Sequence, residues 1–106
     1  MATAQNMPLM TEADYLAAEE MAEERHEYID GYVYAMSGAK AAHNRIAGNI
    51  HTALNVFLKG TPCQPYMSDM KVKVGSKYFY PDVMVDCSNI PDDSTFTQTP
   101  RLIVEV

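Results

Sequence analysis

Two acidic residues of this chain lie among apolar neighbours, where a charged side chain is energetically costly unless it has a partner. Asp82 lies between Pro81 and the apolar run 83–85, and Glu105 lies inside the apolar run 102–106. Burying a carboxylate is costly unless it is paired or bound to a metal ion. If both runs form neighbouring strands, Asp82 and Glu105 can meet at one sheet edge and bind Mg²⁺ or Mn²⁺ through oxygen ligands. Such an ion can activate water and stabilise charge on a scissile phosphate.

A purely structural interpretation of the same two carboxylates stays open. Asp82 would then cap the start of its strand, and Glu105 would pair with a basic side chain such as Arg101 or Lys73. Only the spatial arrangement of the two strands can separate a metal site from a pair of structural contacts.

The N-terminal part predicts one helix followed by a hairpin. Thr11 can cap the backbone N–H groups of a helix running to about residue 24. The acidic residues of this helix have the spacing of a solvated face. Asp30-Gly31 lies between runs rich in aromatic and β-branched residues, which predicts a two-residue turn joining strands at about 26–29 and 32–36.

The middle of the chain predicts a longer helix over residues 39–58. Gly60 suits the position after its C-terminus, and Pro62 prevents its continuation. Its apolar residues recur at helical spacing and predict one buried stripe, which consists of Ile46, Ile50, Leu54, Phe57 and Leu58.

The remainder predicts strands at 69–74, 77–80, 82–87 and 101–106 around a polar loop at 88–99. Alternation in the first of them predicts a buried Val72 and Val74 and a basic face of Lys71 and Lys73. The last strand is almost entirely apolar, which predicts neighbours on both faces and both edges. We therefore expect a chain that is incomplete at its C-terminus.

Length and composition indicate one small globular domain over residues 1–106, because 47% of the 106 residues are hydrophobic and 21% are charged. No apolar run is long enough to span a bilayer, and residues 1–6 lack the features of a signal peptide. A cytoplasmic protein with no membrane partner is expected. Cys63 and Cys87 lack metal-motif spacing and are expected to be reduced and buried.

Charge is distributed unevenly along the chain. Residues 1–30 carry a net charge of −7, residues 31–80 carry +5 and residues 81–106 carry −4, which together give −6. The basic middle could face a phosphate backbone while the acidic flanks bind cations. The lysines could equally be ordinary solvated residues of a helix and a hairpin.

Short motifs in the chain resemble the Uma-two family of bacterial proteins described as restriction endonucleases, within the PD-(D/E)XK nuclease superfamily. The resemblance runs from about Met10 to the last residue. The motifs occur in family order and at family spacing: MTEADYL at 10–16, EYIDG at 27–31, MSG at 36–38, HNRI at 43–46, SDMKV at 68–72, YPDVMV at 80–85 and LIVEV at 102–106.

This resemblance implies an α/β (α+β) fold of the restriction-endonuclease type, a mixed sheet flanked by helices. It implies that Asp82 and Glu105 hold Mg²⁺ or Mn²⁺ and that DNA is the substrate. The superfamily's lysine would fall at position 107, so Lys71 or Lys73 would have to replace it. Family positions also match Glu27 and His43, which gives the catalytic set Asp82, Glu105, Glu27, His43 and Lys73.

The sequence is compatible with three functions. The first is a metal-dependent endonuclease that hydrolyses phosphodiester bonds of DNA. The second is a truncated, catalytically inactive relic, which the missing lysine favours. The third is a binding module that assembles through its last strand, as a homodimer or on another protein.

Overall fold

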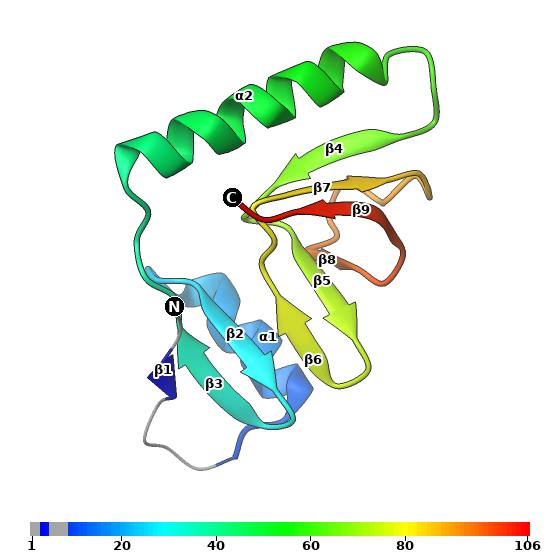
Figure 1. Cartoon of the computed structure of the whole chain (residues 1–106). Coiled ribbons are helices and arrows are strands. Elements are labelled where there is room, and N and C mark those ends of the chain that lie inside the picture. The colour runs from blue at the N-terminus through cyan, green and yellow to red at the C-terminus, as the bar shows by residue number, and fades with distance from the viewer. Residues whose placement is uncertain (1–2, 5–8) are drawn as a thin grey trace. The chain divides into compact units, whose positions relative to one another are not determined.

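A computed structural model describes residues 3–4 and 9–106, with side chains from residue 9 onward (Figure 1). Most of the segment on which the absence of a signal peptide was predicted therefore lies outside the described residues. Among the described residues, no helix has both the length and the apolar character needed to cross a membrane.

The described residues form an α+β structure in the order β1-α1-β2-β3-α2-β4-β5-β6-β7-β8-β9. The bounds are β1 Thr3–Ala4, α1 Glu12–Met21, β2 His26–Ile29, β3 Tyr32–Ala35, α2 Ala41–Phe57, β4 Gln64–Met67, β5 Lys71–Val74, β6 Lys77–Phe79, β7 Val83–Asp86, β8 Phe96–Thr97 and β9 Pro100–Val104. Most strand pairs are antiparallel, whereas β5 and β8 run parallel. Helices with mixed sheets confirm the predicted class and are compatible with a restriction-endonuclease-like fold.

The chain divides into two compact units. Unit 1 comprises residues 1–38 and 73–79, and unit 2 comprises residues 39–72 and 80–106. The prediction of one domain over residues 1–106 stays a prediction.

The hairpin of unit 1 confirms the Asp30-Gly31 turn. β2 and β3 pair antiparallel up to Ile29 opposite Tyr32. Asp30 has a φ of 50° and Gly31 a φ of 97°, the positive values that a tight two-residue turn of this kind requires. A side chain at position 31 would also press on Leu9, whose Cδ2 would lie 3.2 Å from an added Cβ. The local sequence therefore determines the register of this hairpin.

Three tyrosines form the centre of unit 1. Tyr15 of α1, Tyr28 of β2 and Tyr78 of β6 are buried, and their ring centroids lie 5.0 to 5.9 Å apart. Each hydroxyl donates a hydrogen bond, from Tyr15 to the carbonyl of His26, from Tyr28 to that of Met10, and from Tyr78 to Glu12. Buried tyrosines are stable in this form because ring burial is retained while the polar tip stays satisfied.

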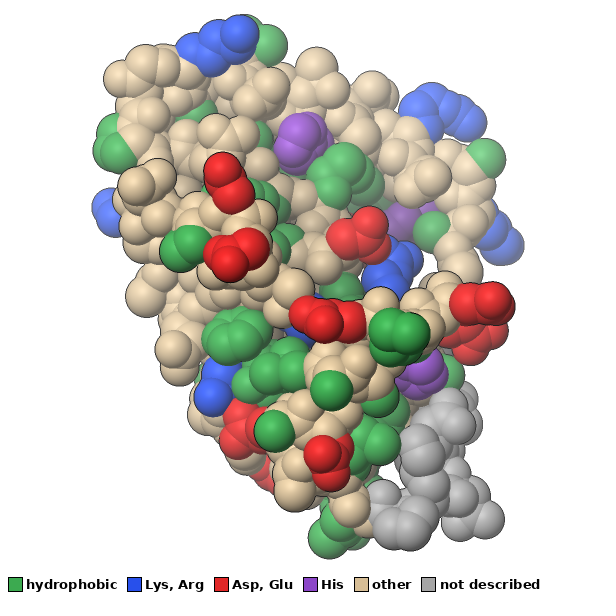
Figure 2. Space-filling view, turned by 180° about the vertical axis from the view of Figure 1, so that it is seen from behind, with side chains coloured by type: hydrophobic (Ala, Val, Ile, Leu, Met, Phe, Trp, Pro, Cys, Tyr) green, Lys and Arg blue, Asp and Glu red, His purple; other side chains and the backbone are tan. Residues whose placement is uncertain are grey.

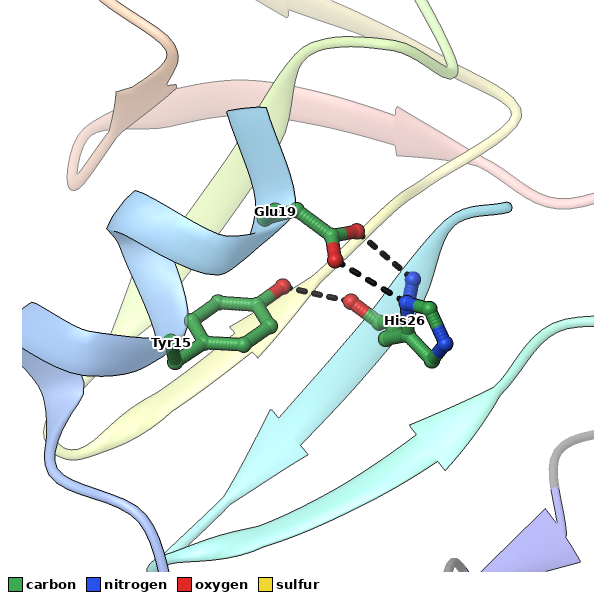
Figure 3. A network of polar contacts seen from close by, with 3 residues as sticks. All are labelled: Tyr15, Glu19 and His26. Carbon is green, nitrogen blue, oxygen red and sulfur yellow. Dashed lines mark hydrogen bonds and ion pairs between the residues drawn. The ribbon is translucent and has the colours of Figure 1, made fainter. Parts of the chain in front are cut away.

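One acidic residue of α1 differs from the predicted solvated face. The Glu19 side chain is mostly buried, and its carboxylate accepts hydrogen bonds from the backbone N–H of His26 at 2.6 Å and from His26 Nδ1 at 3.0 Å (Figure 3). Tyr15 donates to the carbonyl of the same His26, so α1 is attached to the start of β2 by three contacts. The helical spacing of the acidic residues does not indicate that the start of β2 packs against Glu19 and covers its side chain.

The sheet of unit 2 has the strand order β4-β7-β9, with both pairs antiparallel. β7 is central, and all four of its residues are buried, as the apolar Val83-Met84-Val85 run predicted. α2 packs against β4 and β7 and extends alongside β4 in Figure 1. Because β7 is the central strand of this sheet and water does not reach its side chains, apolar residues suit its first three positions.

The predicted buried stripe of α2 was partly wrong. Ile46 is 48% exposed and Phe57 80% exposed, whereas Ala47 is buried. Ile50 and Leu54 are half-buried. The helix face that packs is therefore centred on Ala47, includes Ile50 and Leu54, and is rotated away from Ile46 and Phe57. On the face shown in Figure 2, apolar side chains (green) stand interspersed with polar and charged ones.

The alternation predicted for β5 was partly wrong, since Val72 is buried as predicted but its neighbours do not alternate with it. Lys71 is buried and Val74 is exposed, the reverse of a basic outer face. The backbone N–H of Lys71 donates to the carbonyl of Thr95 at 3.1 Å, and its Nζ lies 5.3 Å from the centroid of the Tyr80 ring. The aliphatic stem of Lys71 is therefore covered, and its charge is placed over an aromatic face.

The cysteines are not reduced and buried as predicted. Cys63 and Cys87 form a disulfide, and both are half-buried. The register explains this pairing, since Gln64 lies opposite Asp86 in the β4–β7 ladder and the cysteines occupy the next opposed positions.

Candidate active site

Register between β7 and β9 places Asp82 and Glu105 side by side. Val83 lies opposite Val104, so the residues just outside the ladder are Asp82 before β7 and Glu105 after β9. The backbone N–H of Asp82 donates to Glu105 Oε1 at 3.2 Å. Two strands that are separated in the sequence thus bring both carboxyl groups to one end of the unit 2 sheet.

The Asp82 side chain is held in place by the backbone of the neighbouring strand. Its Oδ2 accepts a hydrogen bond from the N–H of Val106 at 2.8 Å, and the side chain is 18% exposed. Two hydrogen bonds therefore join the strand ends, because Asp82 donates its backbone N–H to Glu105 and accepts one from the N–H of Val106. Such reciprocal bonds orient both carboxylates before any ligand arrives.

His43 joins the pair from the first turn of α2. Its Nε2 lies 3.2 Å from Asp82 Oδ2, and the histidine is about one-third exposed. Because a carboxylate only accepts hydrogen bonds, Nε2 is the donor in this contact. His43 Nδ1 is buried and has no hydrogen-bond partner in the described part of the chain. Of the residues predicted as catalytic, the structure brings together Asp82, Glu105 and His43.

Glu27 and Lys73 belong to unit 1. Glu27 lies in β2 opposite Tyr34 of β3. Lys73 Nζ forms an ion pair with Glu12 Oε1 at 3.0 Å and lies 5.6 Å from the centroid of the Tyr78 ring. The hydrogen bond to Glu12 raises the pKa of Lys73, and Lys73 in turn lowers the pKa of Glu12. The catalytic roles of Glu27 and Lys73 stay predictions.

Unit 2 contains a buried lysine that the sequence pattern placed on the wrong face. Lys71 belongs to the same unit as Asp82 and Glu105, and Tyr80, over whose ring it lies, precedes Asp82 by two residues. A mostly buried lysine is unusual, because lysine is almost never fully buried unless it is paired. In the sequence, the SDMKV motif singles out Lys71 but does not indicate that its side chain is buried.

Another carboxylate, that of Asp86, is buried at the opposite end of β7 from Asp82. Asp86 is 1% exposed and accepts hydrogen bonds from the Ser88 N–H at 2.7 Å and from the hydroxyls of Ser88, Thr97 and Thr99. Burial alone would raise the pKa of Asp86, but these hydrogen bonds outweigh it and hold the pKa below its usual value. Sequence reasoning missed this residue, since its partners lie up to 13 residues away.

The donor set at Asp82 and Glu105 fits a hard divalent cation. Carboxylate oxygens are the ligands that Mg²⁺ prefers, and Mg²⁺ is usually held by one or two carboxylates while it keeps several waters. In residues 3–4 and 9–106, no group of three or more His, Cys, Asp or Glu side chains is placed to bind a metal ion. The arrangement therefore suits a partly hydrated Mg²⁺ or Mn²⁺ better than Zn²⁺, which takes four tight ligands in a structural site.

Comparison with known proteins gives two similar relatives, both from Synechocystis sp. (strain ATCC 27184 / PCC 6803 / Kazusa). "Uncharacterized protein sll1609" is 37% identical over 103 residues, which cover 92% of this chain and 58% of that protein. "Uncharacterized protein slr1290" is 37% identical over 102 residues, which cover 93% of this chain and 54% of that protein. The chain thus spans little more than half the length of these relatives.

No solved structure matches the chain. The Uma2 (Uma-two) family model, described as "Putative restriction endonuclease", matches residues 12–106. This range contains both helices, the β7–β9 register and every residue of the predicted site, and on this evidence the chain belongs to the Uma2 family.

Proposed function

We propose that this protein is a metal-dependent endonuclease that hydrolyses phosphodiester bonds of DNA. The observation that carries the proposal is the adjacency of Asp82 and Glu105, two carboxylates held side by side at one end of a sheet by strand register. Membership of the Uma2 family supports the same class of activity. A cytoplasmic location is part of the proposal, because DNA is its substrate.

Asp82 and Glu105 would hold the ion, and the surrounding residues would keep both carboxylates in position. Bound Mg²⁺ would supply a Lewis acid for an attacking water and for the charge on the scissile phosphate. His43 donates to Asp82 Oδ2 and limits rotation of that carboxylate. Lys71 is the cation that we propose to steady phosphate charge in unit 2, since it is already oriented over Tyr80.

The charge distribution supports a polyanionic substrate. Residues 31–80 carry +5 although the whole chain carries −6. Lysines and arginines that contact phosphates release counterions, so binding should weaken steeply as salt is added. We expect the affinity for duplex DNA to fall by at least about tenfold between 50 and 200 mM salt.

Plasmid nicking tests the proposed activity directly. Supercoiled DNA is incubated with the protein in Mg²⁺ or Mn²⁺, with EDTA as the control, and open-circular product is measured. Nicking that requires the divalent ion supports the proposal. Calorimetry with Mn²⁺ runs in parallel, because a protein that neither binds Mn²⁺ nor nicks DNA would be the inactive relic instead.

Removing the His43 contact should weaken the site without destroying it. His43→Ala leaves Asp82 Oδ2 with only the N–H of Val106, and loss of such an orienting partner typically costs 10–100-fold in metal affinity or activity. His51→Ala, on the same helix, is the matched control. Mn²⁺ affinity should fall for the first variant and stay unchanged for the second; equal affinities would remove His43 from the site.

A second candidate function is self-assembly through β9, which specific observations favour. β9 is an edge strand of β4-β7-β9 in the described part of unit 2, and Leu102 and Ile103 are each 47% exposed. Antiparallel pairing of two copies centred on Ile103 would place Arg101 of one copy opposite Glu105 of the other. Opposite charges at directly opposed positions stabilise strand pairs. This pairing would occupy Glu105 and so compete with a metal ion.

Light scattering separates the two candidates. If β9 pairs with itself, the protein is a dimer and Ile103→Lys makes it a monomer, while Val56→Lys, at an exposed position of α2, leaves the dimer intact. A wild-type monomer at high concentration would contradict assembly and leave the nuclease proposal unaffected.

A further inference from the structure

The disulfide of unit 2 joins two directly opposed strand positions. The β4–β7 register pairs Pro65 with Val85 and Gln64 with Asp86, which places Cys63 opposite Cys87, and their Cα atoms lie 3.9 Å apart. Pro65 has no N–H to donate, so its pair is of the type without reciprocal hydrogen bonds. Pair types alternate along an antiparallel ladder, and the cysteine pair is therefore of this closer type as well.

The two cysteines are only partly covered by the rest of the chain. Cys63 and Cys87 are half-buried, and their chain neighbours Pro62 and Ser88 are exposed. A structural disulfide is normally protected inside a core, whereas an accessible one exchanges readily with external thiols. The bond lies at the end of the β4–β7 ladder, between two partly exposed residues, rather than within the ladder.

The rest of the strand pairing does not depend on the bond. Four opposed pairs from Gln64–Asp86 to Met67–Val83 connect β4 to β7. Asp86, next to Cys87, is held by its own hydrogen bonds to Ser88, Thr97 and Thr99. We therefore expect the reduced chain to keep the β4–β7 pairing and to lose only the covalent link between the segment after α2 and the end of β7.

We propose that the Cys63–Cys87 bond is redox-reversible in the folded protein, so that an external dithiol opens it and an oxidised thiol compound closes it again. A dithiol thiolate attacks one sulfur, forms a mixed disulfide and releases the other cysteine as a thiolate, which takes up a proton. The second thiol of the reductant then closes its own disulfide and releases the remaining cysteine. The cystine gains two electrons and two protons, and the dithiol loses the same number. The site is independent of Asp82 and Glu105 and does not rest on the nuclease proposal.

Reduction of the folded protein tests the proposal. Dithiothreitol is added under native conditions, free thiols are trapped by alkylation at intervals, and mass spectrometry counts the added groups. We expect two alkyl groups per chain, at a rate proportional to reductant concentration and at least about tenfold faster than global unfolding of the same sample. Reoxidation by oxidised glutathione should remove both reactive thiols.

The double variant Cys63→Ser/Cys87→Ser supplies the matched control. Its melting temperature should not respond to dithiothreitol, whereas that of the wild-type protein should fall on reduction while a cooperative transition persists. Two outcomes would overturn the proposal: a bond that opens only when the chain unfolds, which marks a purely structural disulfide, or air-oxidised protein in which both thiols remain free. Reduced wild-type protein provides the same comparison if the serine variant does not fold.

Discussion

Asp82→Asn is expected to lower both Mn²⁺ affinity and plasmid nicking by more than about 100-fold, since loss of an orienting partner alone costs up to about that much. Asparagine keeps the size of the side chain and can still accept the N–H of Val106, but it removes the negative charge that a divalent ion requires. Glu105→Gln should have a similar effect, because its Oε1 can still accept from the Asp82 N–H while its charge is lost. Calorimetry and the nicking assay measure the two losses separately.

Asp93→Asn is the matched control for these variants, since it removes one exposed carboxylate from the same unit and lies in the loop before β8. Its affinity and activity should equal those of the wild-type protein. Metal binding that survives in both Asp82→Asn and Glu105→Gln would exclude the pair as ligands. The structural interpretation, in which the two residues only tie the strand ends together, would then hold.

Among the substitutions proposed for this protein, Asp86→Ala is expected to lower the free energy of unfolding the most. The carboxylate is almost fully buried and accepts four hydrogen bonds from Ser88, Thr97 and Thr99. Hydrogen bonds to a charged group are worth roughly 1.5–3 kcal/mol each, and solvent can recover part of this at the exposed partners. We expect unfolding free energy to fall by about 3 kcal/mol, which lowers the melting temperature of a domain of this size by roughly 10–20 °C.

The effect of Asp86 should depend on pH in a defined direction. Its pKa in the folded protein lies below its usual value, so the unfolded chain binds a proton more readily. Its contribution to stability is therefore fully present above the unfolded-state pKa, about 3.9, and is lost as pH falls through the lower folded-state pKa. Thermal melts of wild type and Asp86→Asn should differ most near neutral pH and converge in acid.

Asp93→Asn again serves as the comparison, because an exposed carboxylate has no such network to lose. A difference between wild type and Asp86→Asn that stays constant down to pH 2 would contradict the assigned role. So would an Asp86→Ala variant with the stability of the wild-type protein.

Features that depend on neighbouring residues were predictable from the sequence. Thr11 accepts the N–H of Asp14, as its position before the helix predicted, and Asp30-Gly31 turns the hairpin with positive φ at both residues. The central apolar strand of unit 2 was predicted from Val83-Met84-Val85. In each case the physical cause acts within a few residues: a cap bonds the first turn, a turn needs a particular backbone, and burial needs an apolar run.

Features that depend on which face packs were not predictable. The stripe of α2 was drawn through Ile46 and Phe57, whereas the helix packs through Ala47. Lys71 was assigned to a solvated face but is covered beside Tyr80. Periodicity shows that a helix or strand has two faces, but the partner decides which face is buried and by how much.

The sequence alone was sufficient to recognise the family and to single out Asp82, Glu105 and His43. Only the tertiary structure decided that these three meet, since His43 contacts Asp82 across 39 positions of the chain and Asp82 contacts Glu105 across 23. The same holds for the Cys63–Cys87 bond and the network around Asp86. Residue types determine what chemistry is available, but strand register determines which residues share it, because a shift of one residue would turn each side chain to the opposite face of the sheet.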